Sequence, residues 1–242
     1  MRLAGRFAVV TGASSGIGAA VAERLAREGC ELLLVGRDPR RLGAVADRTG
    51  GRPLQADLRG QAGIDEVCAA AAGTVALLVH GAGLGAAGPL ADLDAATTAD
   101  LVAVNLTAPM QLTRALLPTL RAQDGHLAFV ASIAAVGVAD EAVYSATKAG
   151  LRGFADAVRV ESGIGVTTVL PGAVDTPFFT HRGRAYERRF PRPVTAAAVA
   201  DALVDAVRRD RAEVFVPRWL VLGARVHGLA PTIFARLSRR FG

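Results

Sequence analysis

The chain has few of the residues that mark a disulfide-stabilised or membrane-spanning protein. Its two cysteines, Cys30 and Cys68, are far apart in the sequence and show no metal-ligand spacing, so we expect reduced, buried thiols and no metal site. No uninterrupted apolar run reaches the roughly 18 residues of a transmembrane helix. No long apolar segment of the signal-peptide kind precedes Phe7. These absences predict a cytoplasmic protein.

Aromatic residues are also scarce, at 5% of the chain, although hydrophobic residues make up 51%. The core is therefore expected to be built from Ala, Val and Leu. Low aromatic content and the lack of a recognition motif argue against a nucleic-acid partner, even though the formal net charge is +6.

Acidic residues are absent from residues 214–242, which carry five arginines. Residues 1–213 hold 23 of the 28 basic and all 22 acidic residues, so the charge excess belongs to the C-terminal tail. The tail is apolar between its arginines. It suits an amphipathic segment on an anionic membrane or in a partner groove. The alternative is a helix docked on its own subunit or a dimer mate, with its arginines reaching water. Pro231 is expected to break any helix there.

Lysine is almost missing, because Lys148 is the only lysine among the 28 Lys and Arg residues. It follows Tyr144 by four positions, so both side chains would share one face of a helix predicted over 143–161. A nearby cation favours the phenolate and lowers a tyrosine pKa by roughly one to three units. A compact ammonium can also bridge the phenol and ribose hydroxyls. An incidental surface lysine is the simpler alternative, but its uniqueness beside Tyr144 favours a chemical role.

Short apolar runs alternate with patterns of helical periodicity along the chain. The predicted strands are 7–10, 31–35, 53–56, 75–79, 126–130, 166–170 and 213–216. The predicted helices are 17–28, 40–48, 62–72, 97–122, 143–161 and 195–209. This order predicts an α/β fold with one domain: a Rossmann-type, doubly wound, parallel seven-stranded sheet with helices on both faces. We expect residues 1–217 to form this domain and residues 218–242 to form its basic, apolar tail.

Residues 11–18 read TGASSGIG between the first predicted strand and helix. Such a glycine-rich turn brings backbone N–H groups and the positive end of a helix close to a pyrophosphate. An ordinary tight turn is the alternative, and the strand–helix context favours phosphate binding. The predicted contacts here are Gly12, Ser14, Ser15, Gly16, Ile17 and Gly18.

The second predicted strand leads into Gly36, Arg37 and Asp38. Cofactors without a 2′-phosphate usually meet an acid at the end of this strand, whereas a 2′-phosphate needs a cation. Gly36 stands where the acid is expected, and Arg37 follows it. This favours NADP(H), with NAD(H) as the alternative if Asp38 binds the ribose.

Together these motifs resemble the classical short-chain dehydrogenase/reductase family over roughly residues 5–217. Its TGxxxGxG, YxxxK and PG-containing segments match 11–18, 144–148 and 171–177. The resemblance implies that Tyr144 is the general acid or base and that Lys148 lowers its pKa and binds the ribose. It implies that Ser132 orients the substrate oxygen and that Asn105 holds a water of a proton relay.

The resemblance implies further cofactor contacts, to the adenine and nicotinamide ends of the dinucleotide. These residues are Asp57, Leu58, Ala82, Gly83, Pro171, Gly172, Val174 and Thr176, besides Tyr144 and Lys148. One departure is HGAG at 80–83, where the family has NNAG, so His80 and Gly81 replace two asparagines. We expect His80 to be a hydrogen-bonding substitute or a core histidine.

Residues 178–193, FFTHRGRAYERRFPRP, stand where that family has its substrate lid. Their five arginines would attract an acidic substrate or form a solvated flap, and the two phenylalanines at the start of the segment suggest an apolar pocket edge.

The expected function is that of an NAD(P)(H)-dependent, NADPH-preferring oxidoreductase that interconverts a carbonyl and a secondary alcohol. The alternatives are a catalytically silent NADP(H)-sensing protein and, among enzymes, a 3-oxoacyl thioester reductase. The apolar tail and the phenylalanines favour a lipophilic substrate. The resemblance implies a homodimer or homotetramer, and the tail suggests peripheral membrane contact.

Overall fold

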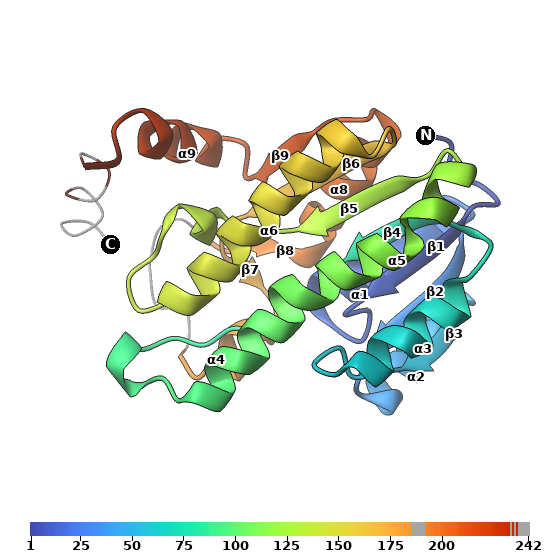
Figure 1. Ribbon diagram of the computed structural model, residues 1–242, viewed down its shortest axis with the longest axis horizontal. Coiled ribbons are helices and arrows are strands. Elements are labelled where there is room, and N and C mark those ends of the chain that lie inside the picture. Colours follow the sequence, from blue (N-terminus) through green and yellow to red (C-terminus); the bar gives the residue numbers. More distant parts are fainter. Residues whose placement is uncertain (185–191, 233, 235, 237–242) are drawn as a thin grey trace.

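The computed structural model describes residues 1–184, 192–232, 234 and 236. Seven parallel strands form its main sheet, in the order β3-β2-β1-β4-β5-β6-β9 (Figure 1). Their bounds are β1 (Phe7–Thr11), β2 (Glu31–Gly36), β3 (Arg52–Gln55), β4 (Val75–His80), β5 (His126–Val130), β6 (Gly165–Pro171) and β9 (Glu213–Val216). The predicted seven-stranded doubly wound sheet is therefore confirmed, and each strand lies within one residue of its predicted ends.

The strand order changes direction at β1, which has β2 on one side and β4 on the other. The two chain segments leaving the carboxyl ends of β1 and β4 diverge from this point, where Thr11 is paired with His80. Ligands of open α/β sheets bind in the crevice at such a switch point. The fold thus places residues 12–18 and 81–85 on either side of one crevice.

Helices cover both faces of the sheet, and alternate strand residues enter the two resulting cores. Ala8 and Val10 of β1 belong to one core, whereas Val9 belongs to the other. The first core is covered by α1 (Gly16–Arg27), α2 (Pro39–Thr49) and α8 (Ala196–Arg208). The second is covered by α3 (Gln61–Ala71), α5 (Ala108–Ala122) and α6 (Ala142–Glu161). Two buried faces explain why the inner strands are apolar at most positions, whereas the edge strand β3 is largely exposed.

The helix predicted over 97–122 is not continuous. α4 (Ala95–Val102) and α5 are joined by a π-helical segment, η2 (Ala103–Thr107), which contains Asn105. A π-helical turn takes up an extra residue and rotates the side chains that follow, and such turns occur often at functional sites. Apolar periodicity over the whole stretch concealed this irregularity.

Several short elements were not predicted. β7 (Val174–Asp175) pairs with β8 (Val194–Thr195), and α7 (Phe178–His181) follows β7. The short 3-10 turns are η1 (Leu90–Asp92) and η3 (Ile133–Val136). All of these elements are too short to produce a recognisable hydrophobic periodicity in the sequence.

The tail begins with α9 (Leu220–Leu229), which lies at the end of the molecule toward which the β5 arrow points (Figure 1). The helix ends before Pro231, as predicted. No helix in the described part of the chain is long and apolar enough to cross a membrane.

Candidate active site

The β1–α1 loop is a backbone surface on which side chains would not fit. Gly12 has a φ of +70°, and a Cβ there would lie 2.7 Å from the backbone of Ala82. A Cβ on Gly18 would lie 2.2 Å from the Gly12 carbonyl oxygen. α1 then begins at Gly16, after the extended Ser15, with no acidic residue in its first turn. Exposed N–H groups and the positive helix end make this loop suited to a pyrophosphate.

Thr11 joins this loop to the one after β4, a role that sequence reasoning missed. Its buried Oγ1 accepts hydrogen bonds from the N–H groups of Gly81 at 3.1 Å and Ala82 at 3.2 Å. It donates to the Val79 carbonyl at 3.3 Å. The only available signal was the threonine that opens TGASSGIG.

His80 is a core histidine, the second of the two alternatives, and it also forms a side-chain hydrogen bond. Its Nε2 lies 2.9 Å from Thr113 Oγ1, and its ring stacks on Phe129 at 4.8 Å between centroids. Burial lowers its pKa to about 3, so the ring is neutral. At Gly81 a Cβ would approach the Thr11 carbonyl oxygen to 2.7 Å. The departure from the two asparagines therefore leaves the crevice lined by backbone here.

Ser132, Tyr144 and Lys148 come together at the base of the crevice. Tyr144 and Lys148 lie on one face of α6, and Ser132 follows β5. The Tyr144 hydroxyl is hydrogen-bonded to Ser132, whose Oγ accepts from the Ala134 N–H at 3.0 Å. Lys148 Nζ donates to the Val130 carbonyl at 2.9 Å and lies 5.8 Å from the Tyr144 ring centroid.

The expectation that Lys148 lowers the pKa of Tyr144 is not met in this arrangement. Burial raises the Tyr144 pKa, and the hydrogen bond from Ser132 opposes this only in part. Burial also lowers the Lys148 pKa to about 8. Both groups have lost water, and this loss of hydration is the largest cause of both shifts. At neutral pH the phenol therefore holds its proton, as a general acid must.

Asn105 is buried beneath the crevice and does not line it. Its Oδ1 accepts from the Leu84 N–H at 2.8 Å, and its Nδ2 donates to the Leu84 carbonyl at 2.9 Å and Thr147 Oγ1 at 3.1 Å. It thus fastens the loop after β4 to α6. Leu84 and Thr147 were not foreseen, and the water relay stays a prediction.

The crevice is a cleft of about 1120 Å³. This exceeds the roughly 300–1,000 Å³ of typical ligand sites, which suits a large cofactor together with a substrate. Every residue predicted to contact the cofactor lines it: Gly12, Ser14, Ser15, Gly16, Ile17, Gly18, Arg37, Asp57, Leu58, Ala82, Gly83, Tyr144, Lys148, Pro171, Gly172, Val174 and Thr176. The segment after β6 reaches the glycine loop, since a Cβ on Gly16 would lie 3.3 Å from Thr176 Cγ2.

Two arginines border the cleft at the end of β2. Arg37 and Arg41 are exposed and line it. A Cβ on the buried Gly36 would lie 3.2 Å from the Ser14 side chain, so an acidic side chain does not fit there without movement of Ser14. Asp38 caps α2, accepting from the Arg41 N–H at 3.0 Å and from Arg41 Nε at 2.8 Å. These bonds hold the Asp38 pKa below its usual range.

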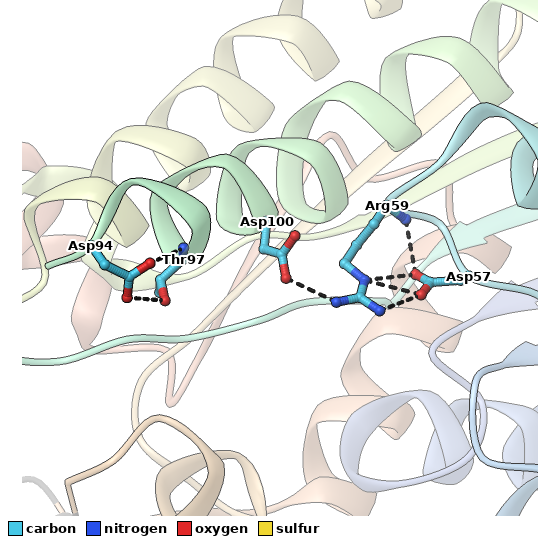
Figure 2. A network of polar contacts seen from close by, with 5 residues as sticks. All are labelled: Asp57, Arg59, Asp94, Thr97 and Asp100. Atoms are coloured by element: carbon cyan, nitrogen blue, oxygen red, sulfur yellow. Dashed lines mark hydrogen bonds and ion pairs between the residues drawn. The ribbon is translucent and has the colours of Figure 1, made fainter.

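Asp57, which the resemblance predicts to contact the adenine, is held by Arg59 (Figure 2). Its carboxylate accepts from the Arg59 N–H at 3.0 Å and from Arg59 Nη2 at 2.6 Å. Arg59 Nη1 also donates to Asp100 of α4 at 3.0 Å. The guanidinium lowers the Asp57 pKa. Arg59, which sequence reasoning did not single out, therefore fixes the loop after β3 against α4.

Comparison with known proteins decides the family. A sequence model described as short chain dehydrogenase matches residues 6–187. The chain belongs to the short-chain dehydrogenase family. It is therefore an oxidoreductase.

Relatives of known name or structure cover nearly the whole chain. It is 31% identical to the ketoacyl reductase HetN of Nostoc, over 99% of this chain and 90% of the relative. A short-chain dehydrogenase from Sphingobium yanoikuyae, solved with NADPH, has a TM-score of 0.82 at 29% identity, over 94% of this chain and 95% of the other. The bulky-bulky ketone specific alcohol dehydrogenase from Comamonas testosteroni has a TM-score of 0.78 at 29% identity, over 94% of each chain.

In this short-chain dehydrogenase an aromatic side chain borders the tyrosine. The rings of Phe178 and Tyr144 lie 5.5 Å apart, and Phe178 leaves no room for a Cβ on Gly85, which would come within 2.4 Å of the ring. Phe179 packs edge-on against Phe178 at 5.8 Å. Phe178 and Phe179 line the cleft and confirm the apolar pocket edge expected from the sequence.

The segment after Phe179 is fastened by ion pairs. Arg182 lies 4.6 Å above the Phe179 ring and pairs with the largely buried Glu141. Arg184 pairs with the exposed Asp140 at 2.9 Å. These two arginines thus already have acidic partners, which weakens the idea that they attract an acidic substrate. Residues 185–191 of the predicted lid, Glu187 among them, lie outside the described residues.

Proposed function

We propose that this short-chain dehydrogenase interconverts a carbonyl and a secondary alcohol with a nicotinamide dinucleotide. The observation that carries the proposal is that Ser132, Tyr144 and Lys148 line the same cleft as the glycine loop, with Lys148 Nζ 5.8 Å from the Tyr144 ring centroid. The cradle fits a dinucleotide because Gly12 and Gly18 allow no side chain, which leaves the backbone N–H groups and the α1 helix end accessible.

The cofactor's nicotinamide would supply or accept the hydride. For carbonyl reduction, Tyr144 would donate its proton to the substrate oxygen, which Ser132 would hold by a hydrogen bond. The raised Tyr144 pKa keeps that proton available at neutral pH. Lys148 would place a positive charge beside the phenolate that forms, and Asn105 would hold the loop around Leu84 in place.

The test is the variant Tyr144→Phe, assayed with a panel of ketones and secondary alcohols. We expect turnover to fall about 10²- to 10⁴-fold, because the proton donor is lost. Thermal stabilisation by the cofactor should persist, since the phenyl ring still fills the site. Unchanged turnover would contradict the proposal, and a wild-type protein that binds the cofactor without turning over any substrate would favour the sensing alternative.

For the cofactor we propose a preference for NADP(H). Arg37 and Arg41 border the cleft, and the space around Gly36 leaves little room for an acidic side chain. The Asp38 carboxylate already accepts hydrogen bonds from Arg41 at the start of α2. Arginine suits a 2′-phosphate through charge and bidentate geometry. The Sphingobium relative was solved with NADPH.

Thermal-shift titrations with NADPH and NADH test this preference. NADPH should stabilise the protein at much lower concentration than NADH. The double variant Arg37→Gln/Arg41→Gln should weaken NADPH binding roughly tenfold or more and leave NADH binding almost unchanged. Arg40→Gln is the matched control, because Arg40 is exposed on the same helix and is not among the lining residues. Tighter binding of NADH would show that the ribose is held by Asp38.

For the substrate we propose a lipophilic ketone or secondary alcohol. Phe178, Phe179, Trp219 and Leu220 line the cleft, and the Comamonas relative acts on bulky ketones by its name. A 3-oxoacyl thioester is the second candidate, favoured by the name of the Nostoc relative. A kcat/KM comparison of aryl ketones, 3-oxoacyl thioesters and hydrophilic carbonyls separates them. Equal values for hydrophilic and lipophilic carbonyls would contradict the proposed class.

A further inference from the structure

Helix α9 and its N-cap residue Trp219 expose an apolar stripe, formed by Trp219, Leu222, Val226 and Leu229. Leu222 is 60% exposed and Leu229 89%, and the other two are also exposed. The spacing of three, four and three residues places all four on one face of a helix. They are four of the seven large hydrophobic residues that are exposed in the described part of the chain. The stripe is therefore a concentrated patch.

The opposite face of α9 is packed on the fold. Leu220 is buried and belongs to a small core with Ala131, Leu170 and Phe215. Val221 and Ala224 are partly buried against the same core. Since this face holds the helix in place, the stripe is directed outward and its exposure does not depend on unfolding.

The charge beside the stripe indicates what would cover it. Arg218 and Arg225 are exposed and seven residues apart, so they lie along one edge of the stripe. Residues 214–242 contain five arginines and no Asp or Glu. An antiparallel pairing of two copies through α9 would bring the arginines of both to the same edge with no acid in the helix to balance them. An anionic surface would instead neutralise them.

We propose that α9 docks in the interface of an anionic lipid bilayer. Leu222, Val226 and Leu229 would enter the boundary between headgroups and acyl chains, and Arg218 and Arg225 would contact the anionic headgroups. A helix that presents an exposed apolar stripe with a basic edge can bind a membrane surface in this way, and it does not need the length of a membrane-spanning helix.

Docking by this face would also orient the molecule. Trp219, Leu220 and Phe234 of the tail line the same cleft as Tyr144. The cleft would therefore lie close to the lipid surface, an arrangement that suits the lipophilic substrate proposed above. Membrane binding itself does not depend on that proposal.

The test uses the full chain and sedimentation with vesicles of phosphatidylcholine, with or without phosphatidylglycerol. We expect binding only with phosphatidylglycerol, weakened by salt because the arginines act through charge. Leu222→Ser/Leu229→Ser should weaken binding about tenfold, since it removes buried apolar area. Leu90→Ser/Val160→Ser is the matched control, because both residues are as exposed as the pair in α9 but lie elsewhere. This control should bind like the wild type.

A second pair of variants tests the charge. Each arginine should contribute about fivefold to the affinity for phosphatidylglycerol vesicles. Arg218→Gln/Arg225→Gln should therefore weaken vesicle binding roughly tenfold or more. Arg2→Gln/Arg27→Gln, which removes two exposed arginines from another part of the surface, should have little effect. Thermal unfolding of each variant shows whether it is folded.

Three results would overturn the proposal. The first is that the wild type does not bind phosphatidylglycerol vesicles, and the second is that the α9 variants bind as well as their controls. The third is that the wild type does not bind vesicles and that Leu222→Ser/Leu229→Ser elutes from size exclusion as a smaller particle than the wild type. The last result would show that the stripe is covered by a second copy. NADPH binding and turnover are separate readouts, so failure here leaves the proposed function untouched.

Discussion

At the scale of single residues, Lys148 shows how the site is built at the expense of stability. Its ammonium is buried, and its pKa falls from 10.5 to about 8 because hydration is lost. A base whose pKa is lower in the folded state destabilises the fold at every pH at which the unfolded chain holds the extra proton. For Lys148 this cost is fully present below about pH 8 and disappears as the pH rises to about 10.5.

We therefore predict that Lys148→Met stabilises the protein at pH 7 while it removes activity. The buried charge costs up to roughly 3 kcal/mol, and loss of the bond to the Val130 carbonyl offsets about 1 kcal/mol of the gain. Urea unfolding at pH 7 measures the difference. Lys148→Arg is the control: its charge cannot be lost, so it should not be stabilised. A less stable Lys148→Met variant would show that the ammonium is favourably paired.

At the scale of elements, α7 is held over the tyrosine by one ion pair that is almost buried. Arg182 and Glu141 are only 9% and 16% exposed, whereas Arg184 and Asp140 in the neighbouring pair are 57% and 47% exposed. Removing one partner of a buried pair leaves the other charge unbalanced, which costs far more than removing an exposed pair.

We predict that Arg182→Gln loosens α7 and relaxes substrate selection by Phe178. Amide hydrogen exchange over residues 178–184 should become about tenfold faster, and KM for bulky ketones should rise. Arg184→Gln is the matched control on the same segment, and both its exchange rates and its KM should stay near those of the wild type. Equal effects of the two variants would mean that the Arg182 pair does not hold the segment.

The sequence predicted long helices and strands with regular hydrophobic patterns well. It predicted less well the features that depend on contacts between residues far apart in the sequence. Apolar runs located most strands of the main sheet, because both faces of those strands are buried, whereas the edge strand β3 is largely exposed. The π-helical turn at Asn105 could not be foreseen, because it depends on hydrogen bonds to Leu84 and Thr147. The sequence also did not indicate that Tyr144 would be buried, and burial raises its pKa, whereas we had expected the pKa to be lowered. Motifs thus located the reacting groups but not their environment.

At the scale of the whole molecule, two neutral histidines are enclosed by the sheet and its helices. His80 ends β4 and contacts Thr113, and His126 begins β5 and contacts Thr167 at 2.8 Å. Burial lowers their pKa values to about 3 and about 4, and the Asp210 carboxylate, 3.9 Å from His126 Nδ1, opposes the shift of His126 only in part. Because unfolding exposes both rings to water, their protonation is coupled to global stability.

We predict that the free energy of unfolding falls as the pH is lowered from 6.5 to 5. In this range the unfolded chain takes up protons on His80 and His126 near pH 6.5, whereas the folded protein does not until about pH 4 or below. Each histidine would then contribute about 2 kcal/mol of lost stability over this interval. Urea unfolding at several pH values measures the slope, and carboxylates add little above pH 5.

The histidine variants separate this effect from other acid-sensitive contacts. His80→Gln/His126→Gln should flatten the dependence between pH 6.5 and 5, whatever its effect on stability at pH 7. His227→Gln, a change in α9 outside both sheet cores, should keep the wild-type slope. An equal slope in the double variant and the wild type would show that the two buried rings gain protons without unfolding. Water would then have to reach the sheet in the folded protein, and the close packing of Phe129 against His80 argues against it.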